Sequence, residues 1–563
     1  MRYPITIVLV AGLCVAPSLA GDEYEAPASY YNSVSATGAT LKTQLLAAMS
    51  DGHIQRNYGN FRDMSRYIDT DPNNPSNILL VYNRASVSGS WDSGVTWNRE
   101  HVWPQSLQPG SASNSSTGNL GDPHALRPAN PSINSSRGNK PFGGGAATTG
   151  NHRSLGTFYF PGDTDKGDIA RSLFYSNTRY PGITLVNGNP GTNQMGDLES
   201  LIAWHYLDIP DTFERRRNHA VYSASLNPLR TNNRNAYIDH PEFVWSVYVD
   251  QMNDTTIYLG DLEPADGAST IDIDLGAYLV GETIDPITID LHKAGDDGTY
   301  YRVTPSAGIT TSLDGCYQAF PIGPANSIPF DISFDTSLTD NNGLRVCNIN
   351  IDNLDVTDQG GNGNGANDAN DTINITATVF EPGNASFDAV IDLNTLELDL
   401  GTIDTGNGPV SQQVIFFNIP ADLFIAPIDI ELISSAGDTT TITTDFMPIA
   451  DLTTLDNAAM SVMLDDQSEG IFNATYTFRV YNARSMFPGD VLVEDLTLNI
   501  TGEVAGSVCT PDLNNDGLLN FFDVSAFLSA YSSNDPAADF TNDGAFNFFD
   551  VSAFLAAYSA GCP

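Results

Sequence analysis

The feature that most constrains the fold is a change of residue pattern near Leu259. Before it, helical patterns alternate with short apolar runs. After it, the chain consists of short alternating runs rich in Thr, Ile, Val and Asp, such as residues 270–275. Such alternation is typical of half-buried antiparallel strands. Because a domain usually holds about 100 to 150 residues, a chain of 563 residues with two such patterns should form several domains of different classes.

The β-rich region contains an internal repeat. The segment at 274–276 recurs at 399–401, and the pattern at 373–376 recurs at 498–501, both after 125 residues. Two independent matches at one spacing predict a tandem pair of all-β, Ig-like sandwich domains. No catalytic constellation is evident in either, so we expect spacer or adhesion modules.

Two near-identical segments close the chain. Each has oxygen-bearing side chains at loop positions 1, 3, 5, 9 and 12 and glycine at position 6, and each runs into a helical pattern. This is the ligand spacing of an EF-hand-like calcium loop, in which position 7 supplies a backbone carbonyl. The predicted Ca²⁺ ligands are Asp512, Asn514, Asp516, Leu518, Asn520 and Asp523 in the first loop, and Asp539, Thr541, Asp543, Ala545, Asn547 and Asp550 in the second. We expect folding of this small all-α tail to depend on calcium.

The tail resembles a dockerin domain, a paired calcium-loop module that attaches secreted bacterial enzymes to a receptor module or surface scaffold. The resemblance implies a cohesin-like or cell-surface receptor as partner. Cys509 and Cys562 bracket the tail, an arrangement that departs from the familiar cellulosomal dockerins.

The N-terminus has the layout of a cleaved secretory signal. Arg2 precedes an apolar run at 5–16, and Ser18-Leu19-Ala20 offers a cleavage site after Ala20. No other run approaches the roughly 18 apolar residues that a membrane helix needs. We therefore expect a secreted, extracellular protein without a membrane span, attached to a cell surface if the tail has a surface receptor. A monomer is favoured, although the sequence does not determine the oligomeric state.

Cysteine usage fits an oxidising compartment. After removal of the signal, four cysteines remain, an even number. Three pairings are open. We favour Cys316 with Cys347 and Cys509 with Cys562, because each pair falls inside one predicted domain.

The acidic charge is unevenly distributed. The formal net charge is -44, yet residues 21–259 carry 18 Lys and Arg against 22 Asp and Glu, whereas residues 260–563 carry 5 against 46. The first domain can therefore still present a cationic groove to phosphates, while the acidic remainder would repel nucleic acid.

Candidate catalytic residues are concentrated between Trp97 and Gly143. This stretch places Glu100 beside His101 and adds a second histidine, arginines and several amides. Phosphodiester hydrolysis needs a base for the attacking water, a cation for the developing charge and groups that hold the phosphate. Histidine suits the base, and carboxylate and amide oxygens suit Mg²⁺. A strand pair at 77–82 and 100–103, followed by a short helix at 128–139, would place His101 opposite Asn134, although the residues alone also permit a structural Glu-His pair.

Three segments in this stretch resemble the signature of the bacterial endonuclease I family, secreted or periplasmic nucleases with a ββα-metal (His-Me finger) site. They are residues 98–104, 122–128 and 134–143, and the similarity extends over nearly all of 25–250. The resemblance implies an α+β nuclease domain, with His101 as general base, Glu100 and Asn134 as ligands of one Mg²⁺, and products with 5′-phosphate ends.

The resemblance also implies an arginine at the scissile phosphate, for which Arg127, Arg137 and Arg234 are candidates. We interpret His124 as structural.

The sequence thus predicts a secreted, sequence-nonspecific, Mg²⁺-dependent endonuclease that acts on DNA, and leaves open whether it also acts on RNA. One alternative is an extracellular ribonuclease that uses the same site, since phosphate and metal contacts do not read the sugar. Another is a catalytically inactive surface-binding protein. The predicted organisation is a signal peptide at 1–20, the nuclease domain at 21–258, β-sandwich domains at 259–382 and 383–505, and the calcium-loop domain at 506–563.

Overall fold

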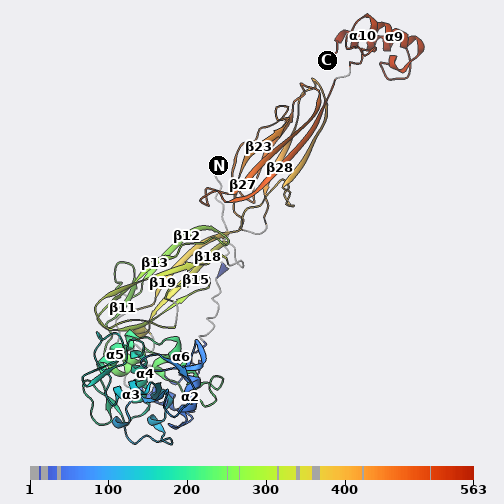
Figure 1. Ribbon diagram of the computed structural model, residues 1–563. Helices are drawn as coiled ribbons and strands as arrows, with labels where there is room; N and C mark the ends of the chain where they lie inside the picture. Colours follow the sequence, from blue (N-terminus) through green and yellow to red (C-terminus); the bar gives the residue numbers. More distant parts are fainter. Residues whose placement is uncertain are drawn as a thin grey trace. The chain divides into compact units, whose positions relative to one another are not determined.

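Two compact units make up the chain in the computed structural model (Figure 1). The first comprises Met1–Leu275, Thr283–Asp335 and Arg345–Thr376, and the second comprises Gly276–Glu282, Thr336–Leu344 and Ala377–Pro563. The structure describes residues 12–13, 23–34, 40–249, 251–265, 267–313, 316–337, 343–357, 368–420, 424–506 and 509–562. Apart from 12–13, the predicted signal peptide lies outside these residues.

The first unit begins with an α+β part. Its helices are α1 (Leu41–Ser50), α2 (Phe61–Ile68), α3 (Pro131–Arg137), α4 (Lys166–Arg179), α5 (Leu198–Leu207), α6 (Thr212–Tyr222) and α7 (Ala236–Asp239). Its strands are β2 (Thr70–Asp71), β3 (Asn74–Leu79), β4 (Ser86–Ser88), β5 (Asn98–His101), β6 (Leu126–Ala129), β7 (Arg153–Leu155), β8 (Phe158–Phe160), β9 (Thr184–Leu185) and β10 (Gln194–Met195).

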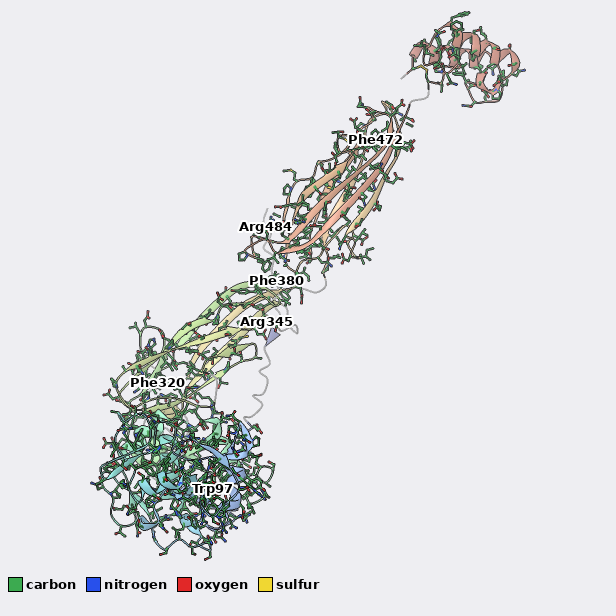
Figure 2. The ribbon with its side chains drawn as sticks, in the orientation of Figure 1. Trp97, Phe320, Arg345, Phe380, Phe472 and Arg484 are labelled. Atoms are coloured by element: carbon green, nitrogen blue, oxygen red, sulfur yellow. A yellow bond between two sulfur atoms is a disulfide. The ribbon has the colours of Figure 1, made fainter. Side chains whose placement is uncertain are left out.

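Helix α4 forms the centre of this part. All but the last of its residues are buried, and the apolar core that contains Leu173 and Phe174 also contains Trp103 and Trp204. Helix α1 buries Leu41, Leu45 and Met49. A second buried cluster contains Phe61 of α2 and Trp97 (Figure 2), together with Ile78 of β3 and Leu126 of β6.

The first unit continues into two β-sheets. One has the strand order β11-β13-β17-β15 and the other β12-β19-β18-β14-β16, with β1 parallel to β18. The strands are β1 (Gly12–Leu13), β11 (Thr256–Leu259), β12 (Thr270–Leu279), β13 (Ile287–Ala294), β14 (Thr299–Pro305), β15 (Ile309–Thr311), β16 (Gln318–Phe320), β17 (Asn326–Phe334), β18 (Gly343–Asn353) and β19 (Asp371–Phe380), and helix α8 (Leu354–Thr357) follows β18.

The α+β part and these sheets share an apolar core. Tyr300 of β14 and Leu354 of α8 belong to the same buried cluster as Trp204. Tyr206 donates a hydrogen bond of 3.0 Å to the buried Asp355 carboxylate, and Tyr300 donates one to the carbonyl of His205. Within the first unit, the helical part and the first β part therefore form one packed body.

The second unit contains two further sheets and a helical tail. The sheets have the strand orders β20-β22-β26-β24 and β21-β28-β27-β23-β25, and β21 runs parallel to β28. The elements are β20 (Ala385–Ser386), β21 (Thr395–Asp404), β22 (Val410–Asn418), β23 (Ile428–Gly437), β24 (Ile442–Thr444), β25 (Ile449–Leu452), β26 (Asn457–Leu464), β27 (Gly470–Asn482), β28 (Leu492–Ala505), α9 (Phe521–Ser533) and α10 (Phe548–Ala560). Phe416 of β22 and Phe478 of β27 meet in the core between the two sheets.

The structure confirms one of the two predicted disulfides. Cys509 is bonded to Cys562 across the tail, whereas Cys316 and Cys347 are not joined by a disulfide. Cys347 lies on β18 and Cys316 just precedes β16, and β14 runs between these two strands. Two strand spacings amount to roughly 9.5 Å, which exceeds the Cα separation that a disulfide spans. The predicted Cys316–Cys347 pairing is therefore wrong.

Among the described residues, no helix is both long enough and apolar enough to cross a bilayer.

Candidate functional site

The stretch between Trp97 and Gly143 folds as a strand pair followed by a helix. The predicted strand at 100–103 and helix at 128–139 correspond to β5 and α3, but β5 pairs with β6 and not with the predicted strand at 77–82, which largely coincides with β3 and pairs with β2 and β4. Strands β5 and β6 are antiparallel, with His101 opposite Leu126. Helix α3 begins after Asn130, whose side chain accepts hydrogen bonds from two backbone N–H groups, and Pro131 occupies the first helical position. It ends at Gly138, whose positive φ of 61° suits glycine.

This motif borders an open cavity of about 310 Å³. Glu100, His101, Asn134 and Arg137 all line it, together with Tyr58 and Arg99. Adjacent residues of a regular strand point to opposite faces, yet Glu100 and His101 border one cavity, because β5 ends at His101. Four predicted site residues are thus brought together.

His101 is held in one tautomer by the backbone. Its Nε2 lies 3.1 Å from the carbonyl oxygen of Leu120. Because a carbonyl oxygen only accepts hydrogen bonds, Nε2 must carry the proton, and Nδ1 keeps its lone pair. Burial lowers the pKa of His101 to about 4, partly offset by this hydrogen bond. The imidazole is therefore neutral at pH 7, the form a general base requires. Its ring also stacks on Tyr58, with 4.6 Å between centroids.

Glu100 is buried, and two hydrogen-bond donors that share one of its carboxylate oxygens hold its side chain in position. The Tyr82 hydroxyl donates to its Oε1 at 2.6 Å and Arg137 Nη1 at 2.9 Å. Burial raises the pKa of this carboxyl, whereas the Arg137 charge and the Tyr82 hydrogen bond lower it. Oε2 has no hydrogen-bond partner among the described residues, so one carboxylate oxygen is available to a cation.

Asn134 is oriented by a second amide. Its Nδ2 donates to Asn98 Oδ1 at 2.8 Å, which leaves its own Oδ1 available. A carboxylate oxygen and an amide oxygen beside one open cavity are ligands that suit Mg²⁺, which keeps several waters. Asn98 and Tyr82 are positioning residues that the sequence reasoning missed, since nothing in their types or spacing marks them.

The three arginines considered for contact with the scissile phosphate are all engaged with other groups of the protein. Arg137 borders the cavity, but its guanidinium is buried and bonded to Glu100 and to the carbonyls of His101 and Val102. Arg127 lies outside the cavity, 3.7 Å from Asp168 and 4.0 Å from Asp69.

Arg234 is likewise buried, in an ion pair with Asp239 at 2.7 Å. The cavity's half-buried arginine is instead Arg99, which forms no salt bridge in the described part of the chain.

The second histidine of the stretch lies elsewhere. His124 is buried against Tyr175, with ring centroids 4.5 Å apart, and is not among the residues that line the cavity. Burial lowers its pKa to about 4. These contacts fit a structural interpretation of His124.

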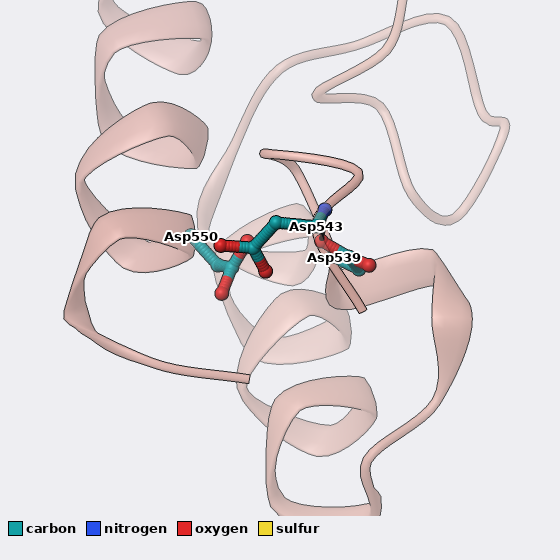
Figure 3. Close-up of side chains that lie close together, drawn as sticks. All are labelled: Asp539, Asp543 and Asp550. Carbon is teal, nitrogen blue, oxygen red and sulfur yellow. Dashed lines mark hydrogen bonds between the residues drawn. The ribbon is translucent and has the colours of Figure 1, made fainter. Parts of the chain in front are cut away.

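The two tail loops differ in how their carboxylates are arranged. In the second loop, ligand oxygens of Asp539, Asp543 and Asp550 lie within 4.8 Å of one another (Figure 3). The first-loop carboxylates form no such group among the described residues. Both loops turn at a glycine with positive φ, 76° at Gly517 and 75° at Gly544. The donors are all oxygens, which fits a hard cation such as Ca²⁺.

Comparison with known proteins agrees with this geometry. Residues 37–242 match the family model described as Endonuclease I. An extracellular ribonuclease of Bacillus amyloliquefaciens is 34% identical over 235 residues, which cover 39% of this chain and 78% of the relative. An extracellular ribonuclease of Bacillus subtilis (strain 168) is 35% identical over 226 residues, which cover 38% of this chain and 75% of the relative.

Solved structures add little. The adhesive subunit CfaE of the CFA/I fimbria of enterotoxigenic Escherichia coli is 11% identical, covers 44% of this chain and 99% of that chain, and has a TM-score of 0.23, which is too low to carry an argument. The family match and the two relatives lead to one conclusion: the chain belongs to the Endonuclease I family and is a nuclease that hydrolyses phosphodiester bonds of nucleic acids.

Proposed function

We propose that the chain is a secreted, sequence-nonspecific, metal-dependent endonuclease that cleaves both DNA and RNA and leaves 5′-phosphate ends. The observation that carries the proposal is the cavity at the end of β5, which is lined by Glu100, Asn134 and His101, with the Nε2 of His101 bonded to a carbonyl and its Nδ1 therefore unprotonated. No contact in this set depends on base identity, which fits cleavage without sequence preference.

The residues have distinct roles. His101 Nδ1 accepts a proton from the attacking water, whose oxygen bonds to phosphorus. The bond between phosphorus and the 3′ oxygen breaks, that oxygen takes a proton from solvent water, and His101 afterwards returns its proton to solvent. Mg²⁺ held by Glu100 and Asn134 would stabilise the negative charge that grows on the phosphate and the leaving oxygen. Tyr82 and Asn98 keep these two side chains in position.

Arg99 is the cavity's candidate for phosphate contact. Its guanidinium is half-buried and has no carboxylate partner in the described structure, unlike Arg127, Arg137 and Arg234. A guanidinium suits bidentate contact with a phosphate.

A second candidate function is a ribonuclease restricted to RNA. It is favoured by the two relatives, both described as extracellular ribonucleases, and these names also support export. Restriction to RNA would require a contact with the 2′-hydroxyl group. A catalytically inactive protein is disfavoured, because Glu100, His101 and Asn134 are all present and border one cavity.

The tail is proposed to be a dockerin-like, calcium-binding attachment module. The arrangement of Asp539, Asp543 and Asp550 supports the calcium site. Four phenylalanines at the starts of the two helices are largely exposed, a surface that a cohesin-like or cell-surface receptor could cover. They are Phe521, Phe522, Phe548 and Phe549.

A substrate comparison tests the main proposal. Purified protein is incubated with supercoiled plasmid, single-stranded DNA and RNA, each with Mg²⁺ and with EDTA. The proposal expects all three to be cleaved only with Mg²⁺, and the ends to carry 5′-phosphate. Cleavage of RNA alone would select the restricted ribonuclease, and full activity in EDTA would reject the metal-dependent mechanism.

A further inference from the structure

The half-buried Arg99 differs in its surroundings from six other arginines of the first unit. The guanidiniums of Arg84, Arg127, Arg137, Arg171, Arg217 and Arg234 each lie within 4.0 Å of a carboxylate. Arg99 instead donates to the carbonyl of Tyr58 at 2.6 Å and lies over the Tyr58 ring at 3.6 Å from the centroid. These contacts fix its position without neutralising its charge.

A second cation is bound by the next residue of the chain. Arg62 of α2 donates through Nε to the carbonyl of Gly59 at 3.0 Å, and Arg99 donates to the carbonyl of Tyr58, the residue before Gly59. Arg62 forms no salt bridge among the described residues. Two neighbouring guanidiniums without an acid repel each other, unless an anion lies between or beside them.

A third arginine, Arg66, lies further along α2. Arg99, Arg62 and Arg66 are here called the arginine row. Arg66 follows Arg62 by four residues, so both lie on one face of the helix. Arg66 is exposed and contacts the ring of Tyr67, at 4.8 Å from the centroid. The nearest carboxylate in sequence, Asp63, forms no salt bridge with either arginine in the described structure. Like charges at this spacing in a helix repel each other, yet neither arginine forms a salt bridge among the described residues, in a protein with net charge -44.

This row connects directly with the cavity. The Tyr58 ring contacts both Arg99 and His101, so the row begins one aromatic ring away from the proposed base. Arg62 binds the carbonyl of Gly59, the residue after Tyr58, and Arg66 lies about one helical turn further along α2.

We infer that Arg62 and Arg66 form a subsite for the backbone phosphates that follow the cleaved one along a nucleic-acid strand, with Arg99 as the link to the cavity. The inference rests on the proposed nuclease function and specifies its substrate as a polymeric strand rather than a dinucleotide. Contacts to phosphate carry no sequence or sugar information, so the subsite serves DNA and RNA strands alike.

The test uses the full-length protein and the double variant R62Q/R66Q, which removes two charges and keeps two polar side chains. The charge-matched control is R479Q/R484Q, whose arginines lie in half-exposed ion pairs of the second unit. Binding of a labelled 20-nucleotide single strand is measured by fluorescence anisotropy in EDTA over a series of salt concentrations. Cleavage of the same strand and of a dinucleotide is measured with Mg²⁺.

The inference predicts that R62Q/R66Q weakens binding of the 20-nucleotide strand on the order of 10-fold. The slope of log affinity against log salt should fall by about 1.4, because each phosphate contact with a single strand contributes about 0.7. KM for the strand should rise while kcat, dinucleotide cleavage and the melting temperature stay unchanged, and the control should behave as the wild type.

Two results separate failure of the inference from failure of the proposed function. A double variant that binds with wild-type affinity and salt slope overturns the inference, and so does a wild-type protein that does not bind the strand. If the wild type binds the strand through Arg62 and Arg66 but cleaves neither substrate, the subsite stands and the proposed nuclease function fails.

Discussion

The side-chain amides of Asn98 and Asn134 are joined by a hydrogen bond of 2.8 Å, from Nδ2 of Asn134 to Oδ1 of Asn98. It links the start of β5 to the middle of α3 across the candidate site. Its consequence is that the remaining oxygen of Asn134 is left for a cation.

Replacing Asn98 by Ala should weaken metal binding without removing a ligand. Loss of a group that orients a metal ligand typically costs about 10- to 100-fold in metal affinity or activity, so the Mg²⁺ concentration for half-maximal rate should rise by that factor. N98D keeps an acceptor oxygen for Asn134 Nδ2 and should retain much of the wild-type response. An unchanged Mg²⁺ titration for N98A would show that Asn98 does not position Asn134.

His124 should make stability depend on pH. Burial lowers its pKa from 6.5 to about 4 in the folded chain, so the unfolded chain binds the proton first as the pH falls. The stability that neutral His124 contributes is present above pH 6.5 and is lost progressively between 6.5 and about 4, up to about 3 kcal/mol. In that window the melting temperature of the wild type should approach that of H124Q.

The comparison with H124Q removes the opposing effects of buried carboxyls with raised pKa, such as Asp208 at about 7. Melting can be followed by tryptophan fluorescence, because all five tryptophans lie at or before residue 245 and report on the first unit alone. A difference between the two proteins that stays constant from pH 7 to 4.5 would contradict the assignment.

The shared core predicts that a residue of the first β part stabilises the helical part. Tyr300 is fully buried against His205 and Tyr206. Truncation of a large buried aromatic costs about 3 to 5 kcal/mol, so Y300A should markedly lower the tryptophan-reported melting temperature. Y476A, a buried tyrosine of the second unit, should leave that transition unchanged. Equal tryptophan-reported melting temperatures for the wild type and Y300A would show that the helical part and the first β part fold independently.

Calcium removal should affect the tail selectively. The three aspartates of the second loop repel one another without a cation, so chelation should reduce helical circular dichroism while the tryptophan-reported transition stays in place. Isothermal titration should find two Ca²⁺ per chain in the wild type and one in D539N/D543N. D399N, an exposed substitution on β21, is the control. Retention of both sites in the double variant would contradict the proposed ligands.

Sequence reasoning was most successful where chemistry is local. The strand predicted at 100–103 and the helix predicted at 128–139 are formed as β5 and α3, whereas the pairing of β5 with β6 was not predicted. The alternating pattern after Leu259 predicted strands, which the structure also confirms. Such features follow from turn residues, side-chain period and capping, all of which are readable within a few residues.

Features that depend on tertiary pairing were not predictable. The roles of Arg127 and Arg137 depend on which carboxylates fold against them, Asp168 and Glu100 respectively. The pairing of Cys316 with Cys347 failed because β14 runs between their strands, and strand order is not encoded in spacing. Arg99 was missed because the absence of an acidic neighbour appears only in three dimensions.

The central claim is that His101 is the general base of this nuclease. The most direct test is the rate of cleavage of RNA and of plasmid DNA by H101A in Mg²⁺, compared with wild type at equal protein concentration. Loss of a general base typically costs about 10²- to 10⁴-fold, so we predict at least a 100-fold loss on both substrates with an unchanged melting temperature. Cleavage of both substrates by H101A at the wild-type rate would contradict the account.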